Sequence, residues 1–181
     1  MCIRDSYVGG DFTVSGANAT ANLAAFDTTT GNNTSWTPDP DNEVHVLALD
    51  GSTLYVGGEF ANIGGAGLST LAAISVSTGL ATAWVPPTPN AAVKAMKISG
   101  NRLLVGGEFV TLGATPRNGA ASFSLTTGLL EAWNPDLGAA PVVVNFGLVT
   151  GGIYIGGQSF WNTIGPEGSF TLVDSTTGAP L

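Results

Sequence analysis

A short motif recurs along this chain of 181 residues, and its recurrence constrains the fold more than any other feature. Each copy has an aromatic residue or Leu, an aliphatic residue, and two glycines. In the first three copies an acidic residue and Phe follow. The four copies occupy residues 7–12, 55–60, 104–109 and 154–159. A Thr-Gly pair and a Trp-x-Pro motif keep the same spacing, which gives a period of about 48 to 50 residues.

Each period divides into extended runs separated by turns. In the second copy these runs are 44–49, 54–60, 70–76 and 80–84, with a longer loop at 61–69. Four antiparallel strands in a repeat of this size are typical of a β-propeller blade. We therefore expect an all-β fold, a β-propeller fragment of about three and a half four-stranded antiparallel blades.

The repeat also sets the domain boundaries that we expect. Residues 1–6 precede the first motif and are predicted to be a non-native or disordered leader. Residues 7–181 are predicted to form one partial β-propeller, with blades near 7–38, 44–86, 93–135 and 142–181. The remaining blades of a parent propeller are the first partners that this division implies.

The repeated residues have structural roles in this interpretation. Glycine after Thr supplies the positive φ of a short hairpin. The glycine pairs allow backbone or a large side chain to approach the second strand, and each Trp is expected to pack between adjacent blades. These residues are Gly9, Gly10, Gly57, Gly58, Gly106, Gly107, Gly156, Gly157, Trp36, Trp84, Trp133, Gly31, Gly79, Gly128 and Gly178.

The repeat resembles a known family. Its Trp-x-Pro, Val-x-x-Leu, Leu-Tyr-Val-Gly-Gly-Glu-Phe and Thr-Gly elements are similar to the delta-sixty-type propeller repeats of bacterial surface and secreted proteins. More distantly, they are similar to the fungal cortical cell-polarity marker and to kelch repeats. The resemblance covers residues 7–181 and implies an extracellular or cell-surface location, but it implies no shared activity.

Charge narrows the partners that we expect. The chain has 13 acidic and five basic residues, giving a formal net charge of −8. Phosphate contacts need clustered Lys or Arg, and these five residues are scattered, so we expect no nucleic-acid partner. No apolar run reaches the roughly 20 residues of a membrane span, so we expect no membrane insertion. Glycans and surface proteins are the remaining candidate partners.

Three acids follow the glycine pairs and are the candidate ligand-binding residues of the repeat: Asp11, Glu59 and Glu108. We expect them on the face that carries the long loops, where binding residues usually lie. One hypothesis is an acidic rim that holds Ca²⁺ or binds sugar hydroxyls. The alternative, favoured by repetition, is that each acid accepts backbone N–H bonds within its own blade.

Trp161 is the candidate that belongs to one copy only, because the other copies have Val14, Asn62 and Thr111 at its position. An exposed Trp could stack on a sugar ring. Alternatively, Phe160 and Trp161 fill space left at Ser159.

Known propeller enzymes need residues that this chain lacks. It has one His and no arginine cluster, and it contains no nucleophile-elbow motif. We expect no catalytic residues, no resident metal and no cofactor, with Ca²⁺ as the one ion considered. The expected function is a non-catalytic propeller module of a secreted or cell-surface protein, with a scaffold or adhesion role. The alternative is a carbohydrate- or cation-binding domain attached to an enzyme.

Overall fold

The computed structural model describes residues 5–13, 20–138, 141–158 and 169–181. These residues form strands and turns without any helix, and the strands pair in antiparallel sheets. The chain divides into two compact units, residues 1–85 and residues 86–181. The all-β expectation is therefore confirmed.

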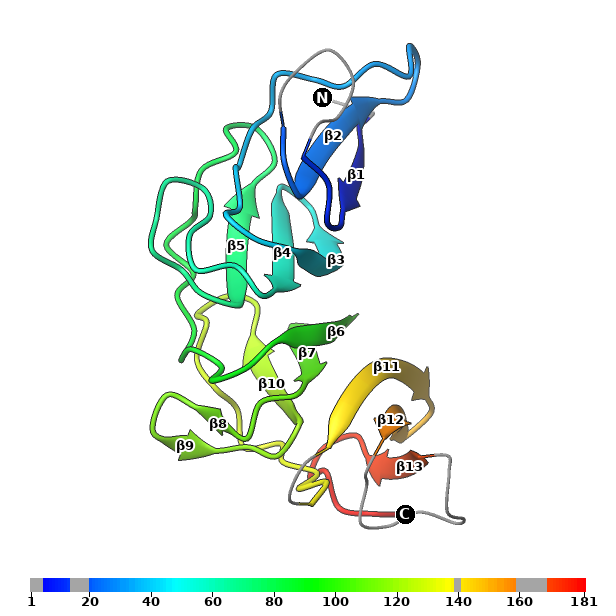
Figure 1. Ribbon diagram of the computed structural model, residues 1–181. Coiled ribbons are helices and arrows are strands. Elements are labelled where there is room, and N and C mark those ends of the chain that lie inside the picture. The colour runs from blue at the N-terminus through cyan, green and yellow to red at the C-terminus, as the bar shows by residue number, and fades with distance from the viewer. Residues whose placement is uncertain (1–4, 14–19, 139–140, 159–168) are drawn as a thin grey trace. The chain divides into compact units, whose positions relative to one another are not determined.

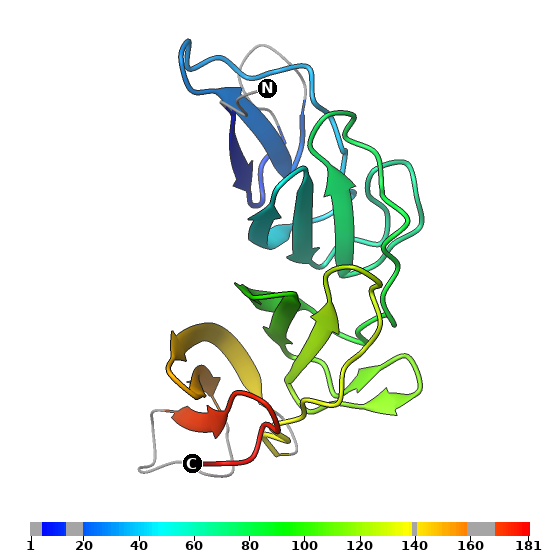
Figure 2. The same cartoon turned by 180° about the vertical axis from the view of Figure 1, so that it is seen from behind.

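The unit of residues 1–85 contains two sheets, drawn in blue and in cyan to green in Figure 1. The first sheet pairs β1 (Asp5–Gly9) with β2 (Leu23–Asp27). The second has the order β3 (Val44–Asp50), β4 (Thr53–Gly58) and β5 (Leu71–Ser75), which lie side by side in Figures 1 and 2. Strand β1 begins at Asp5, so the last two residues of the expected leader extend this pairing.

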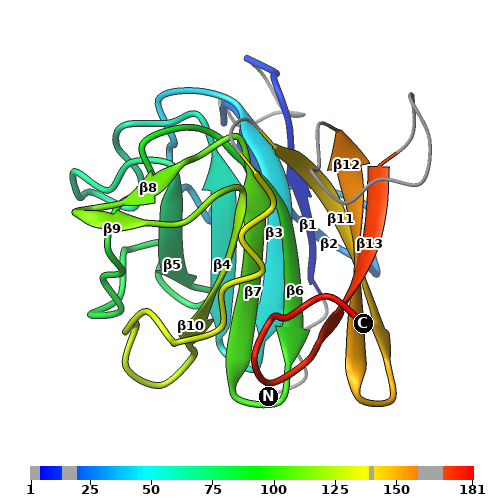
Figure 3. The same cartoon turned by 90° about the horizontal axis from the view of Figure 1, so that it is seen from below.

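The unit of residues 86–181 repeats the three-stranded arrangement twice. One sheet has the order β6 (Val93–Ser99), β7 (Arg102–Gly107) and β10 (Ala120–Ser124). The other has the order β11 (Val142–Val149), β12 (Gly152–Gln158) and β13 (Ser169–Asp174). A small hairpin of β8 (Thr111–Leu112) and β9 (Thr115–Pro116) lies within the loop between β7 and β10 (Figure 3). Each period thus supplies one sheet.

The expected fourth strand is reduced to one isolated bridge per sheet. These bridges are Phe26–Asn33, Ile74–Ala81, Phe123–Leu130 and Val173–Pro180. The pairing stops early in the second repeat because Thr82 Oγ1 accepts the Trp84 N–H at 3.2 Å. This local bond competes with the ladder, and Pro86 then removes a backbone donor. The prediction of four full strands per repeat was wrong in this respect.

The turn that follows each third strand has the predicted left-handed glycine. Gly31, Gly79, Gly128 and Gly178 have φ between 72° and 82°. In the last turn Asp174 Oδ1 accepts the backbone N–H groups of Thr176 and Thr177. The bonds from the Thr177 backbone N–H and hydroxyl, followed by that from the Thr176 N–H, lower the pKa of Asp174.

Trp36 and Trp133 join neighbouring sheets within each unit, as expected. The Trp36 indole N–H donates to Ser75 O at 3.1 Å, and the Trp133 indole donates to Asp174 O at 3.1 Å. Tyr7 meets Trp36 edge-on, with ring centroids 5.1 Å apart. Trp133 is 1% exposed, so both its ring and its polar group are satisfied in the interior.

In two of the pairs, the first glycine gives room to the next sheet. A Cβ on Gly9 would collide with Val44 of β3, and a Cβ on Gly106 would collide with Val143 of β11. Val44 is 2% exposed and Val143 is fully buried. The predicted close approach at these glycines is therefore confirmed at both places.

Candidate functional site

The first strand of each three-stranded sheet, β3, β6 or β11, contains a β-bulge at the same position of the repeat. We call it the inner strand. Pairing with the second strand runs from Val44 to Val46 in β3, from Val93 to Ala95 in β6, and from Val143 to Asn145 in β11. One residue is passed over each time: His45, Lys94 and Val144. A bulge bends its strand and redirects a side chain.

The second glycine of the pair accommodates this bulge. A Cβ on Gly58 would collide with the carbonyl oxygen of Glu43, and a Cβ on Gly107 would collide with that of Ala92. These carbonyls accept the next backbone N–H of the second strand, from Glu59 at 2.9 Å and from Glu108 at 3.0 Å. Glycine is needed here because backbone, which has no room to move aside, occupies the space of a side chain.

Two of the bulge residues, His45 and Lys94, face the side chain that follows the glycine pair. His45 Nε2 lies 3.1 Å from Glu59 Oε1, and Lys94 Nζ lies 2.8 Å from Glu108 Oε1. His45 Nδ1 also lies 3.4 Å from Glu43 Oε1. The two carboxylates approach opposite ring nitrogens, so they do not converge on one point as metal ligands would.

The predicted acids therefore have a role that sequence reasoning missed. Glu59 and Glu108 are exposed and pair with basic side chains of the adjacent strand, rather than accepting backbone N–H bonds in their own loop. The fourth repeat lacks both members of the pair. It has Val144 at the position of His45 and Lys94, and Gln158 at the position of Glu59 and Glu108. This covariation between repeats was the signal that could have revealed the pair.

Asp11 is also exposed, at the same position of the first repeat. Trp161 lies outside the described residues. Within the described ranges, no group of three or more His, Cys, Asp or Glu side chains is arranged to hold a metal ion.

The long loops lie beside the linkers between repeats, as strand alternation predicted. Asp41 Oδ1, in the linker before β3, accepts the N–H groups of Ala61 and Asn62 at 2.7 and 3.0 Å. Asn90 Oδ1 makes the same pair of bonds to Val110 and Thr111. The side chain of Asn62, and then its backbone N–H, lower the pKa of Asp41.

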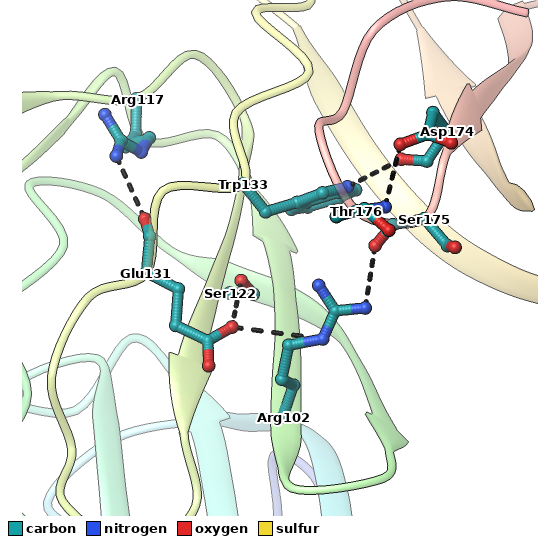
Figure 4. Close-up of polar contacts among 8 residues, drawn as sticks. All are labelled: Arg102, Arg117, Ser122, Glu131, Trp133, Asp174, Ser175 and Thr176. Carbon is teal, nitrogen blue, oxygen red and sulfur yellow. Dashed lines mark hydrogen bonds and ion pairs between the residues drawn. The ribbon is translucent and has the colours of Figure 1, made fainter.

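A second polar cluster lies between two sheets of residues 86–181 (Figure 4). Glu131 Oε2 accepts the Ser122 hydroxyl at 2.8 Å and lies 3.9 Å from Arg102 Nε. Arg102 Nη2 donates to Ser175 O at 2.7 Å, across to the turn after β13. Arg117 Nη2 donates to the Glu131 backbone carbonyl at 3.1 Å. These groups are directed at one another, which indicates a structural link between the sheets.

No protein-family model matches this sequence, and no curated protein matches it. Solved structures do resemble it. The computationally designed Ika4 protein has a TM-score of 0.59 at 15% identity, covering 84% of this chain and 78% of Ika4. The designed Ika8 protein has a TM-score of 0.61 at 17% identity, covering 98% and 48% of the two chains.

A chain of the mitotic checkpoint complex is similar to the same extent. Its TM-score is 0.61 at 16% identity, covering 88% of this chain and 44% of that chain. The present chain thus spans about half the length of the second designed protein and of the checkpoint chain. No helix in the described residues is long and apolar enough to cross a membrane. The neighbours are designed and WD40-like proteins of propeller type, and the likeness shows an all-β, propeller-like fold.

Proposed function

We propose that this chain is a non-catalytic interaction module of β-propeller type in a secreted or cell-surface protein. One observation carries the proposal. The same bulge projects His45, Lys94 and Val144 from equivalent positions, while the glycines beneath them do not change. A fixed backbone with a variable side chain at each repeat suits recognition of another molecule.

Exposure supports the choice of the bulge positions. The His45 and Lys94 side chains are 18% and 30% exposed, beside carboxylates that are 48% and 41% exposed. Val144 is 54% exposed. Each repeat therefore offers a different chemistry at its bulge: imidazole, ammonium or an aliphatic surface. The resemblance to bacterial surface repeats and the net charge of −8 support the location.

The test compares two ends of the same strands. A labelled triple variant, His45→Ala, Lys94→Ala and Val144→Ala, is applied to bacterial cells and to immobilised extracellular-matrix proteins. Its matched control replaces Asp50, Ser99 and Val149 with Ala. These residues lie at the opposite ends of β3, β6 and β11. We expect the unmodified chain and the control to bind, and the bulge variant to lose binding. Equal loss in both variants, or none in either, contradicts the proposal.

A specific hollow supports carbohydrate binding as a second candidate. It measures about 410 Å³ and lies between the end of the first repeat and the loop after β4. Its lining includes Pro38, Asp39, Asn62 and Leu80, and Leu80 is 58% exposed. A carboxylate and an amide beside an apolar surface match the hydroxyl groups and the apolar face of a sugar.

A glycan array tests this alternative with Asp39→Asn as the key variant. Asn tolerates the left-handed backbone that Asp39 adopts, at φ 46°, so the change removes charge with little strain. The carbohydrate candidate requires a glycan that binds the unmodified chain and an Asp50→Asn control, but not Asp39→Asn. An array without such a glycan removes it.

A further inference from the structure

Asp39 and Asp136 occupy the same position of the repeat, three residues after its tryptophan. Both have a left-handed backbone, with φ of 46° and 45°. The Asp136 carboxylate accepts a hydrogen bond from the Asn118 side-chain amide at 2.6 Å. Within the described residues, no hydrogen bond or ion pair reaches the Asp39 carboxylate. The two equivalent acids therefore differ in their partners.

The sequence explains this difference. Gly119 and Asn22 are equivalent, because the N–H of each donates to the Phe carbonyl of its own motif, at 2.8 and 2.9 Å. Asn118 therefore corresponds to Ala21, whose methyl side chain cannot donate a hydrogen bond. Asn22 Nδ2 donates to Pro40 O at 3.1 Å, so this segment lies beside the linker that contains the unpaired acid. The first repeat keeps the acid and lacks its donor.

Asp39 lines the hollow between the end of the first repeat and the loop after β4. Its volume of about 410 Å³ lies within the roughly 300–1,000 Å³ of small-ligand sites. Asn62 Nδ2 donates to Asp41 Oδ2 at 2.7 Å, and this bond fixes the orientation of the amide. Asn62 Oδ1 then lies towards Gly67, 3.8 Å from where a Cβ would stand. Among the described residues that line the hollow, none is basic.

Hydrogen bonds hold the walls of the hollow in place. Gly64 N–H donates to Pro38 O at 2.6 Å, and Gly64 O accepts the Ala81 N–H at 2.9 Å. Leu80 is 58% exposed and adds an apolar surface beside these groups. A site whose walls are already fixed loses little freedom when a ligand binds.

We propose that this hollow binds an amino sugar, whose ammonium group donates to Asp39 and Asn62 while its ring lies against Leu80. The proposal rests on the carbohydrate candidate and names the class of sugar. An ammonium group has three donors and no acceptor, which matches a pair of acceptor oxygens. Its charge gives a stronger hydrogen bond to the Asp39 carboxylate than a neutral hydroxyl does. An acidic sugar would instead meet a like charge.

Chemical-shift titration of the whole chain with glucosamine, at pH 6 where the amine is protonated, tests the proposal. N-acetylglucosamine has the same ring without the charge. We expect it to bind about tenfold more weakly, because a charge-assisted hydrogen bond is lost. Asp39→Asn should weaken glucosamine binding to the same extent. Asp50→Asn, which removes an equal charge from the turn after β3, should leave the affinity unchanged.

Two further variants block the hollow without removing a charge. Gly67→Leu fills it, at a position where the third repeat has Pro116 and so tolerates a side chain. Ala21→Asn gives Asp39 the amide donor that Asp136 has. We expect both variants to lose glucosamine binding while circular dichroism and melting temperature show a retained fold. Full affinity in the folded variants overturns the proposal.

The other outcomes separate the amino sugar from the carbohydrate candidate itself. Equal affinity for glucosamine and N-acetylglucosamine overturns the ammonium assignment and leaves the carbohydrate candidate in place. Equal loss in Asp39→Asn and Asp50→Asn overturns it as well, because net charge would then explain the binding. Butylamine has the ammonium group without the ring. If it binds as tightly as glucosamine, the hollow takes an alkylammonium group, such as a lysine side chain, and the sugar is excluded.

Discussion

The Gly-Gly pairs meet two different steric requirements, and the pair of Gly106 and Gly107 meets both. Gly9 and Gly106 leave room for a Val of the next sheet, and Gly58 and Gly107 leave room for a backbone carbonyl of the adjacent strand. Neither requirement depends on a positive φ, because these glycines are absent from the left-handed positions of the chain. Space, rather than backbone freedom, explains why both positions are glycine.

Alanine substitutions separate these requirements. Gly58→Ala and Gly107→Ala place a methyl group against a backbone oxygen, and we expect each to cost about 1–3 kcal/mol of stability through overpacking. Gly10→Ala meets ordinary contact distances and should change stability by less than about 0.5 kcal/mol. Urea unfolding monitored by tryptophan fluorescence measures all three, and equal losses would contradict this explanation.

Trp133 is the largest fully buried side chain among the described residues. Trp133→Ala should lower the free energy of unfolding by about 3–5 kcal/mol, since it removes a large ring and leaves a cavity. Trp133→Phe retains most of the packing but leaves Asp174 O without its indole donor, and should cost about 1 kcal/mol more than the lost ring area alone. Thermal unfolding of both variants checks the order, which a tolerated Trp133→Ala would contradict.

At the scale of elements, the linkers hold the long loops through one polar side chain each. Asp41 and Asn90 accept equivalent backbone bonds, but only Asp41 titrates. Because hydrogen bonds from Asn62 lower the folded-state pKa of Asp41, its contribution to stability is fully present above the ordinary aspartate pKa of about 4. That contribution is lost as pH falls through the lowered folded-state pKa.

Asp41→Asn imitates the linker of the next repeat and tests this pH dependence. The variant retains the two backbone bonds that Asn90 shows to be compatible with an amide. We expect the drop in melting temperature between pH 7 and pH 3 to be smaller in Asp41→Asn than in the unmodified chain. An unchanged drop would mean that ionisation of Asp41 does not stabilise the loop.

The sequence predicted the elements better than their edges. The three strands of the second, third and fourth repeats, the left-handed Thr-Gly turns and the contacts of Trp36 and Trp133 followed from the period and from alternation. The outer strand was over-predicted, because alternation at 80–84 gives no sign that Thr82 binds the Trp84 N–H. The bulge was missed because one inserted residue leaves the apolar pattern of β3 and β6 almost unchanged.

At the scale of the whole molecule, the second, third and fourth repeats use one sheet design and differ in the side chain at the bulge of the first strand. The predicted neighbourhood of long loops and linkers is seen in the bonds that Asp41 and Asn90 make to their loops, whereas the assignment of function to it stays a prediction. The acids on that face were assigned the wrong partners, because cross-strand pairs depend on a register that a bulge shifts.

Cross-strand nuclear Overhauser effects over the full chain test this design most directly. The account predicts antiparallel contacts within each period, with one residue passed over after Val44, Val93 and Val143. It also predicts a side-chain contact between His45 and Glu59. Uninterrupted registers at these three positions, or helical contacts within a repeat, would contradict it.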